Sequence, residues 1–149
     1  MDIDKTLDRI ISLEIEIENT YISYIKKTDN QSLKQLLYSL LDQEKEHKKR
    51  LIEIKKNPSL LYAFADWKDR EFSLKLYVSD KKYSESISQN DFLLFLIDKK
   101  EKMSKLYSNL SSMARDRNIA FFFTSLAYEE QKHKNWVVNR YELEMLSSF

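Results

Sequence analysis

The chain has only two histidines, and each of them stands three residues after a glutamate. The pairs are Glu44 with His47, in the stretch LDQEKEHKKR, and Glu130 with His133, in the stretch AYEEQKHKNW. Residues three positions apart lie on the same face of a helix, so each pair can present a carboxylate oxygen and an imidazole nitrogen to one point. Carboxylate and imidazole are ligands of divalent transition metals, and two such pairs facing each other would form a metal site.

The two pairs belong to an internal repeat with an offset of 86 residues, which also places Tyr21 on Tyr107. A single pair of this kind is more often a solvated surface pair than a ligand set. Two pairs in register that use every histidine of the chain favour a site of metal-binding ancestry. Each tyrosine alone is typical of a core residue, but next to carboxylates its hydroxyl is expected to hydrogen-bond to the outer side of a ligand.

The remaining ligands of a metal site inside a helical bundle come from the partner helix of each pair, as a glutamate that points inward. Glu14 fits this role because it lies seven residues before Tyr21, about two helical turns, on the same face. Its neighbours in the stripe are Ile10, Ile11 and Ile17. A charged side chain in an apolar stripe requires a partner, so Glu14 is expected to be a third carboxylate ligand.

The composition indicates the elements that position these residues. A chain of 149 residues is the size of one domain, and it contains no glycine and a single proline, which favours long helices over a many-stranded sheet. The predicted fold is all-α: an antiparallel four-helix bundle with helical hairpins over about 4–57 and 91–147. A long crossover over residues 58–90 connects the second helix to the third.

Apolar residues at spacings of three and four predict the first helix over residues 4–27, and Asn57-Pro58 ends the second. Asp91 is expected to cap the third helix, and the fourth is expected over residues 115–146 after a brief turn. The crossover has no sustained period, so we expect irregular structure there with one short helix near residues 60–64.

Taken together, these motifs resemble the rubrerythrin branch of the ferritin-like di-iron carboxylate proteins. Glu14, Tyr21 and EKEH carry the resemblance in the first hairpin, and Tyr107 and EEQKH carry it in the second, where residues 105–142 are especially similar. The resemblance implies two irons bridged by the glutamates of the two Glu-x-x-His pairs, with one histidine and one terminal glutamate on each iron. It also implies ferrous oxidation or reduction of oxygen or peroxide, with an external electron donor.

One position departs from this pattern, because the offset of 86 carries Glu14 onto Lys100. The nearest acid, Glu101, is rotated by about 100° and would reach inward only through a π-bulge, and Asp98 is no better aimed. Lys100 is expected to point inward as a counter-ion, the alternative being that its ammonium reaches water. Three carboxylates and one ammonium carry a net charge of −2, which matches one divalent ion.

The resemblance and its departure at Lys100 together imply a degenerate di-metal site. This site is expected to bind one iron ion, an ion of another divalent transition metal, or no metal. Whether it is an enzyme stays open, and the catalytic residues are unknown. The expected roles are terminal ligands for Glu14 and His47, former bridges for Glu44 and Glu130, ligand or hydrogen-bond partner for His133, and counter-ion for Lys100. The alternative is a metal-free helical module for interaction or structure that has lost the chemistry.

Charge and composition exclude several other classes. With 25 basic and 24 acidic residues interspersed, the chain lacks the basic patch of a nucleic-acid-binding protein. The absence of cysteine excludes disulfides, cysteine-ligated zinc and iron–sulfur clusters. No stretch is apolar enough to span a membrane, so we expect a cytoplasmic protein without a membrane partner. The apolar stretches AFFF at 120–123 and NWVV at 135–138 favour a homodimer contact, with packing against the crossover as the alternative.

Overall fold

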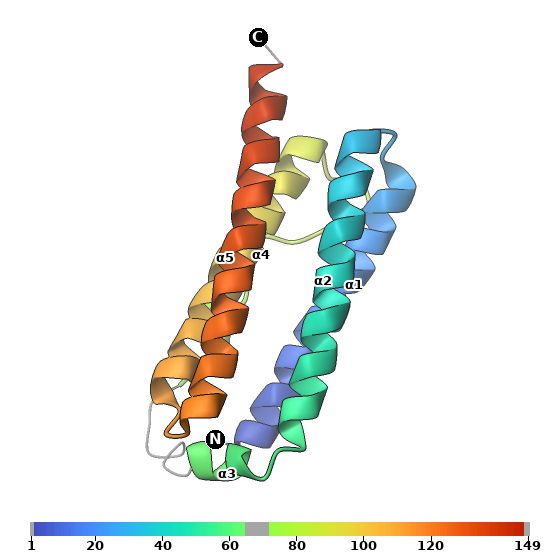
Figure 1. Ribbon diagram of the computed structural model, residues 1–149. Helices are drawn as coiled ribbons and strands as arrows, with labels where there is room; N and C mark the ends of the chain where they lie inside the picture. Colours follow the sequence, from blue (N-terminus) through green and yellow to red (C-terminus); the bar gives the residue numbers. More distant parts are fainter. Residues whose placement is uncertain (1, 65–71, 148–149) are drawn as a thin grey trace. The chain divides into compact units, whose positions relative to one another are not determined.

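The computed structural model describes residues 2–64 and 72–147, and every regular element in these ranges is helical (Figure 1). The elements are α1 (Ile3–Lys27), α2 (Gln31–Lys55), α3 (Ser59–Ala63), the 3-10 helix η2 (Leu74–Tyr77), α4 (Gln89–Met113) and α5 (Arg117–Leu146). The predicted all-α class is confirmed, and the four long helices are those expected of a helical bundle. Residues 65–71 of the expected crossover lie outside the described residues.

The chain divides into two compact units. The first unit comprises Met1–Phe72 together with Met113–Ile119, and the second comprises Ser73–Ser112 together with Ala120–Phe149. Each unit is therefore built around one of the two predicted helical hairpins, α1 with α2 and α4 with α5.

The first unit contains the antiparallel hairpin of α1 and α2 (Figure 1). The Asp2 carboxylate accepts a hydrogen bond of 2.9 Å from the Asp4 N–H, and the Asn30 side chain accepts one of 3.0 Å from the Leu33 N–H. Both side chains thereby satisfy backbone donors that a helix N-terminus leaves without an internal partner. The buried apolar residues of α1 recur at the predicted spacings and include Leu7, Ile10, Ile17, Tyr21 and Tyr24.

The first unit also contains α3, the short helix that the sequence predicts near residues 60–64. The Ala63 carbonyl at its end accepts a hydrogen bond of 2.9 Å from the Arg115 N–H, which lies in the turn between α4 and α5. In the same turn, the Asp116 carboxylate caps α5 by accepting a hydrogen bond of 3.0 Å from the Ile119 N–H.

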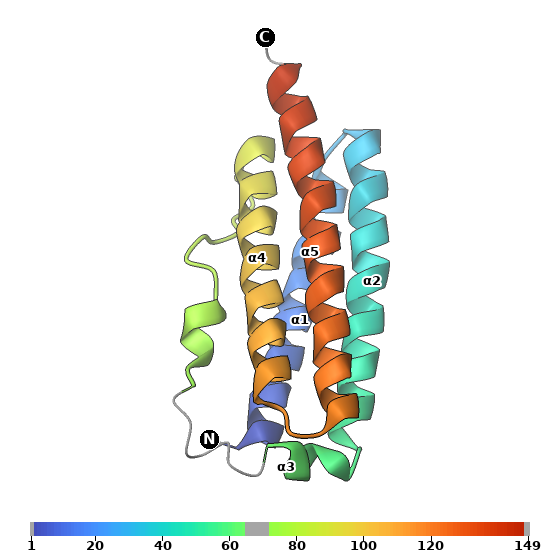
Figure 2. The ribbon, with the colours of Figure 1, turned by 60° about the vertical axis from the view of Figure 1, so that its left-hand side comes forward.

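The second unit contains the antiparallel hairpin of α4 and α5, and η2 lies alongside α4 (Figure 2). The Val78 carbonyl, directly after η2, accepts a hydrogen bond of 3.3 Å from the Lys102 ammonium. The prediction that Asp91 caps α4 is wrong. The helix begins at Gln89, and the Ser88 hydroxyl accepts a hydrogen bond of 3.2 Å from the Asp91 N–H, so Asp91 lies in the first turn. None of the described helices combines the length and the apolar character needed to cross a membrane.

Candidate metal centre

The hairpin of the first unit positions three of the predicted ligands. Glu14 lies on α1 between Ile10 and Ile17, at spacings of four and three residues, so its carboxylate shares the buried face of that helix. Glu44 and His47 lie three residues apart on the buried face of α2. The exposed fractions of Glu14, Glu44 and His47 are 1%, 1% and 0%. Two carboxylates this deeply buried are costly unless a cation or hydrogen-bond donors compensate their charge.

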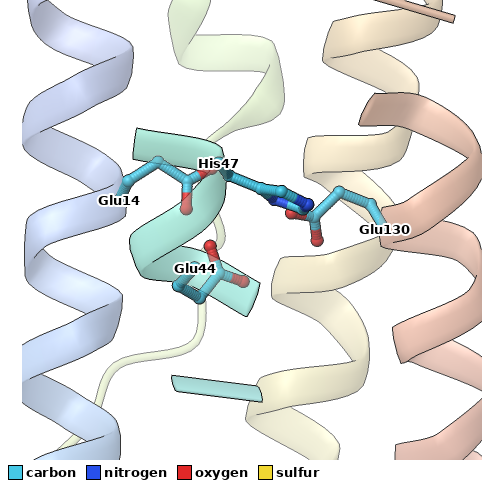
Figure 3. A group of neighbouring side chains, drawn as sticks. All are labelled: Glu14, Glu44, His47 and Glu130. Atoms are coloured by element: carbon cyan, nitrogen blue, oxygen red, sulfur yellow. The ribbon is translucent and has the colours of Figure 1, made fainter. Parts of the chain in front are cut away.

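A fourth buried side chain joins these three. Glu14, Glu44, His47 and Glu130 each offer one ligand atom, and these atoms all lie within 4.8 Å of one another. The three carboxylates and the imidazole point toward one another in Figure 3. Ligands on opposite sides of a transition-metal ion are about 4.2 Å apart, because each metal–ligand bond is about 2.1 Å. The four atoms could therefore hold a metal ion.

Lys100 and Glu130 form a buried ion pair in the second unit. The Lys100 ammonium on α4 lies 3.1 Å from a carboxylate oxygen of Glu130 on α5. The side chains are only 2% and 1% exposed. This arrangement differs from the alternative in which the ammonium reaches water, and it places a positive charge directly on one of the four clustered ligands.

Glu101 and Asp98, the two acids that could replace the missing carboxylate at position 100, interact with other side chains. α4 is α-helical from Gln89 to Met113, and the Glu101 carboxylate pairs with Lys134 at 2.7 Å and Lys105 at 3.4 Å. The hydrogen bond from Lys134 holds the pKa of Glu101 below its ordinary value. Asp98 contacts Ser79 and lies 3.7 Å from the Lys102 ammonium. Neither acid belongs to the buried cluster.

The pair of Glu101 with Lys134 gives a modest, pH-dependent prediction. We expect Glu101→Gln to lower the free energy of unfolding by about 0.5 kcal/mol at neutral pH, because a partly exposed ion pair contributes little. Since the folded pKa of Glu101 is lowered, its contribution is present above the unfolded pKa and is lost as the pH falls through the folded pKa. Urea unfolding of wild type and variant should therefore differ at about pH 7 and converge toward about pH 3. Glu16→Gln, at an exposed position of α1, is the control, and an equal difference at both pH values would contradict the assignment.

His133 is buried but does not belong to the cluster of four ligand atoms. Its ring packs against the Trp136 ring with a centroid distance of 4.9 Å and an interplanar angle of 45°. The Lys132 ammonium lies 5.5 Å from the centre of the same Trp136 ring. Trp136, part of the apolar stretch NWVV, is not among the predicted site residues, although the three-residue spacing in HKNW is a signal for this contact.

The ion pair of Lys48 with Glu18 is a second contact that the sequence does not predict. The Lys48 ammonium on α2 lies 3.0 Å from a carboxylate oxygen of Glu18 on α1. Glu18 is buried in the first unit, one turn after Glu14. This pair joins the two helices next to the candidate ligands, so it helps to fix their positions.

The two tyrosines of the repeat are both fully buried. The Tyr107 ring stacks on the Phe123 ring of α5, with a centroid distance of 6.3 Å and an interplanar angle of 19°. Such packing suits a core residue, and the expected hydrogen bond from each hydroxyl to a ligand stays a prediction.

The apolar stretch AFFF divides between interior and surface. Phe123 is fully buried, whereas Phe121 is 71% exposed, and Tyr128 is also exposed one heptad further along α5. A homodimer contact through this face stays a prediction.

The chemistry of the donor set fits a transition metal. Three carboxylates and one imidazole provide hard oxygen donors and one nitrogen donor, which suits iron, manganese, cobalt or zinc better than copper(I). The histidine distinguishes the set from the all-oxygen sites preferred by magnesium and calcium.

Comparison of the chain with protein-family models, with curated proteins and with solved structures finds no match in any of the three.

Proposed function

We propose that the protein binds a divalent transition-metal ion, iron in the first instance, through Glu14, Glu44, His47 and Glu130. The observation that carries this proposal is the approach of four buried ligand atoms to within 4.8 Å of one another. The resemblance of the motifs to rubrerythrin-like proteins supports iron, and the departure at Lys100 makes the site a degenerate form of a di-metal site.

The energetic reason for a metal lies in the charges. The cluster contains three buried carboxyl groups, and the Lys100 ammonium lies 3.1 Å from that of Glu130. Transfer of uncompensated carboxylates from water into a protein interior is strongly unfavourable. A divalent cation bound to these carboxylates would offset this cost.

An iron ion in this site would supply one-electron redox chemistry, and the four side chains would hold and orient it. The function supported best is therefore iron-dependent reduction of oxygen or peroxide, or ferrous oxidation. The chain has no cysteine for an iron–sulfur relay, so repeated reduction of oxygen or peroxide would require an external electron donor, whereas in ferrous oxidation the ferrous ion supplies the electrons. A metal-free helical module is the outcome to be distinguished from this function by experiment.

Metal analysis tests the proposal directly. We expect protein purified without chelator and incubated with ferrous, manganese or zinc salts to retain at least one ion per chain after desalting, as measured by elemental analysis. Glu44→Gln should lose most of this metal, because it removes a charged ligand. The matched control is Glu46→Gln, an exposed glutamate on the same helix, which should bind as wild type does. Retention of no ion with any of the three salts would contradict the proposal and leave the metal-free module.

A further inference from the structure

The second unit contains a cavity between the first turns of α4 and the segment that connects η2 to α4 (Figure 2). Its volume is about 240 Å³. Each of the two segments contributes three lining residues, which are Lys81, Lys82 and Ile87 from the connecting segment and Asp91, Leu94 and Phe95 from α4. None of the four candidate metal ligands lines this cavity, so it is a separate feature of the molecule.

The inner part of the cavity is apolar and is held in place by aromatic contacts. Phe95 is 5% exposed, and Ile87 and Leu94 are half-buried. The Tyr83 ring lies 6.0 Å from the Phe92 ring and 6.4 Å from the Phe95 ring, measured between centroids. These contacts fix the connecting segment against α4, so the apolar wall is formed before any ligand binds.

The outer part of the cavity is charged. Lys81, Lys82 and Asp91 are all exposed, and together they give the rim a formal charge of +1. Within the part of the chain that the structure describes, neither lysine ammonium forms an ion pair. The rim therefore offers two ammonium groups to a negatively charged group, directly above an apolar surface.

We propose that this cavity binds a small amphipathic carboxylate, that is, an organic acid with one carboxylate and a short apolar body. The volume equals that of about eight water molecules at about 30 Å³ each, which suits an apolar body of about eight carbon atoms. The body contacts the wall formed by Leu94 and Phe95, and the carboxylate accepts hydrogen bonds from the two ammonium groups.

Asp91 determines the preferred charge of the ligand. Its carboxylate lines the same rim as Lys81 and Lys82 and repels anions, so the rim attracts a single negative charge better than the double charge of a phosphate monoester. The inference is independent of the proposed metal-binding function, because no residue of this cavity belongs to the metal cluster.

The test is calorimetric titration of the full chain with octanoate. We expect saturable binding of one octanoate per chain, at least about tenfold tighter than binding of acetate, which lacks the apolar body. Octylamine, which has the same body and the opposite charge, should bind more weakly than octanoate. In backbone NMR spectra, octanoate should cause its largest shifts within residues 81–95.

Two variants with opposite effects test the rim. Lys81→Gln/Lys82→Gln should raise the dissociation constant of octanoate about fivefold, because two partly exposed ion pairs with the ligand are lost. Asp91→Asn should lower it about twofold and should also improve the binding of octyl phosphate. Lys45→Gln/Lys49→Gln removes two charges at exposed positions of α2 and is the matched control, which should bind octanoate as wild type does.

Three results would overturn the proposal. They are no saturable binding of octanoate below the concentrations at which it forms micelles, equal binding of octanoate and octylamine, and the same octanoate affinity in wild type and the folded Lys81→Gln/Lys82→Gln variant. A sedimentation assay with phosphatidylglycerol vesicles distinguishes a free acid from an anionic membrane lipid. We expect no co-sedimentation, and co-sedimentation that the Lys81→Gln/Lys82→Gln variant loses would assign the site to a lipid surface instead.

Discussion

Replacement of Lys100 by methionine is expected to lower the free energy of unfolding of the metal-free protein by about 3–5 kcal/mol, the range typical of breaking a buried ion pair on one side. The ammonium lies 3.1 Å from Glu130, and both side chains are almost completely inaccessible to water. Methionine has a similar volume and keeps the packing, so the loss reports the removal of the ammonium from the Glu130 carboxylate. Urea unfolding followed by circular dichroism in the presence of a chelator measures this change.

The double variant Lys100→Met/Glu130→Leu separates charge from packing. Replacing both partners of a buried ion pair by apolar residues is often neutral or stabilising, so we expect the double variant to regain most of the stability lost in the single variant. Lys105→Met, at an exposed position of the same helix, should change the free energy of unfolding by less than about 0.5 kcal/mol. A single variant within about 1 kcal/mol of wild type, or a double variant as unstable as the single one, would show that the pair does not carry this energy.

The long helices could be predicted from the sequence because their signals are local. Apolar residues at spacings of three and four mark the buried faces of α1 and α2, and Asn57-Pro58 marks the end of the second. The burial of Glu14 follows from the same spacing, since a residue between Ile10 and Ile17 on one helix face cannot avoid the interior.

The start of α4 could not be predicted correctly because two side chains compete for the cap. Ser88 and Asp91 are both good N-cap residues, and only the backbone geometry decides between them. The hydrogen bond from the Asp91 N–H to the Ser88 hydroxyl places the start at Gln89. Similarly, the 3-10 helix η2 depends on its position beside α4 rather than on a periodic pattern of its own.

Contacts between helices were also beyond prediction from one sequence. The partner of Glu101 is Lys134, 33 residues away, and the partner of Lys48 is Glu18, 30 residues away. Spacing within one helix identifies which side chains share a face, but the relative register of two helices decides which of them meet. For this reason the repeat offset predicts that Lys100 is equivalent to Glu14, but it does not predict the partner of Lys100. The ion pair of Lys100 with Glu130 is seen only in the structure.

Metal binding is expected to raise the free energy of unfolding by about 2.7 kcal/mol at a free metal concentration of 100 times the dissociation constant, and by about 4.1 kcal/mol at 1,000 times. This follows because the ligands converge only in the folded protein, where the four atoms lie within 4.8 Å of one another. For a chain of this size, each kcal/mol raises the melting temperature by about 2–4 °C, so a shift of about 5–16 °C is expected. Differential scanning calorimetry with and without cobalt(II) or zinc measures it.

Glu44→Gln is expected to stabilise the metal-free protein and to destabilise the metal-bound protein. These opposite effects test the site more sharply than the stabilisation of wild type by metal. Without metal, we expect the variant to be more stable than wild type, because one fewer carboxylate is buried in a cluster whose negative charges repel one another. With metal, we expect it to be less stable than wild type, because the glutamine amide is a weaker ligand and most of the stabilisation by metal disappears.

The order of the two melting temperatures should therefore reverse when metal is added, whereas Glu46→Gln, exposed on the same helix, should follow wild type in both conditions. A variant that gains as much from metal as wild type does would exclude Glu44 as a ligand, because stabilisation by a bound ion depends on the side chains that hold it in the folded state.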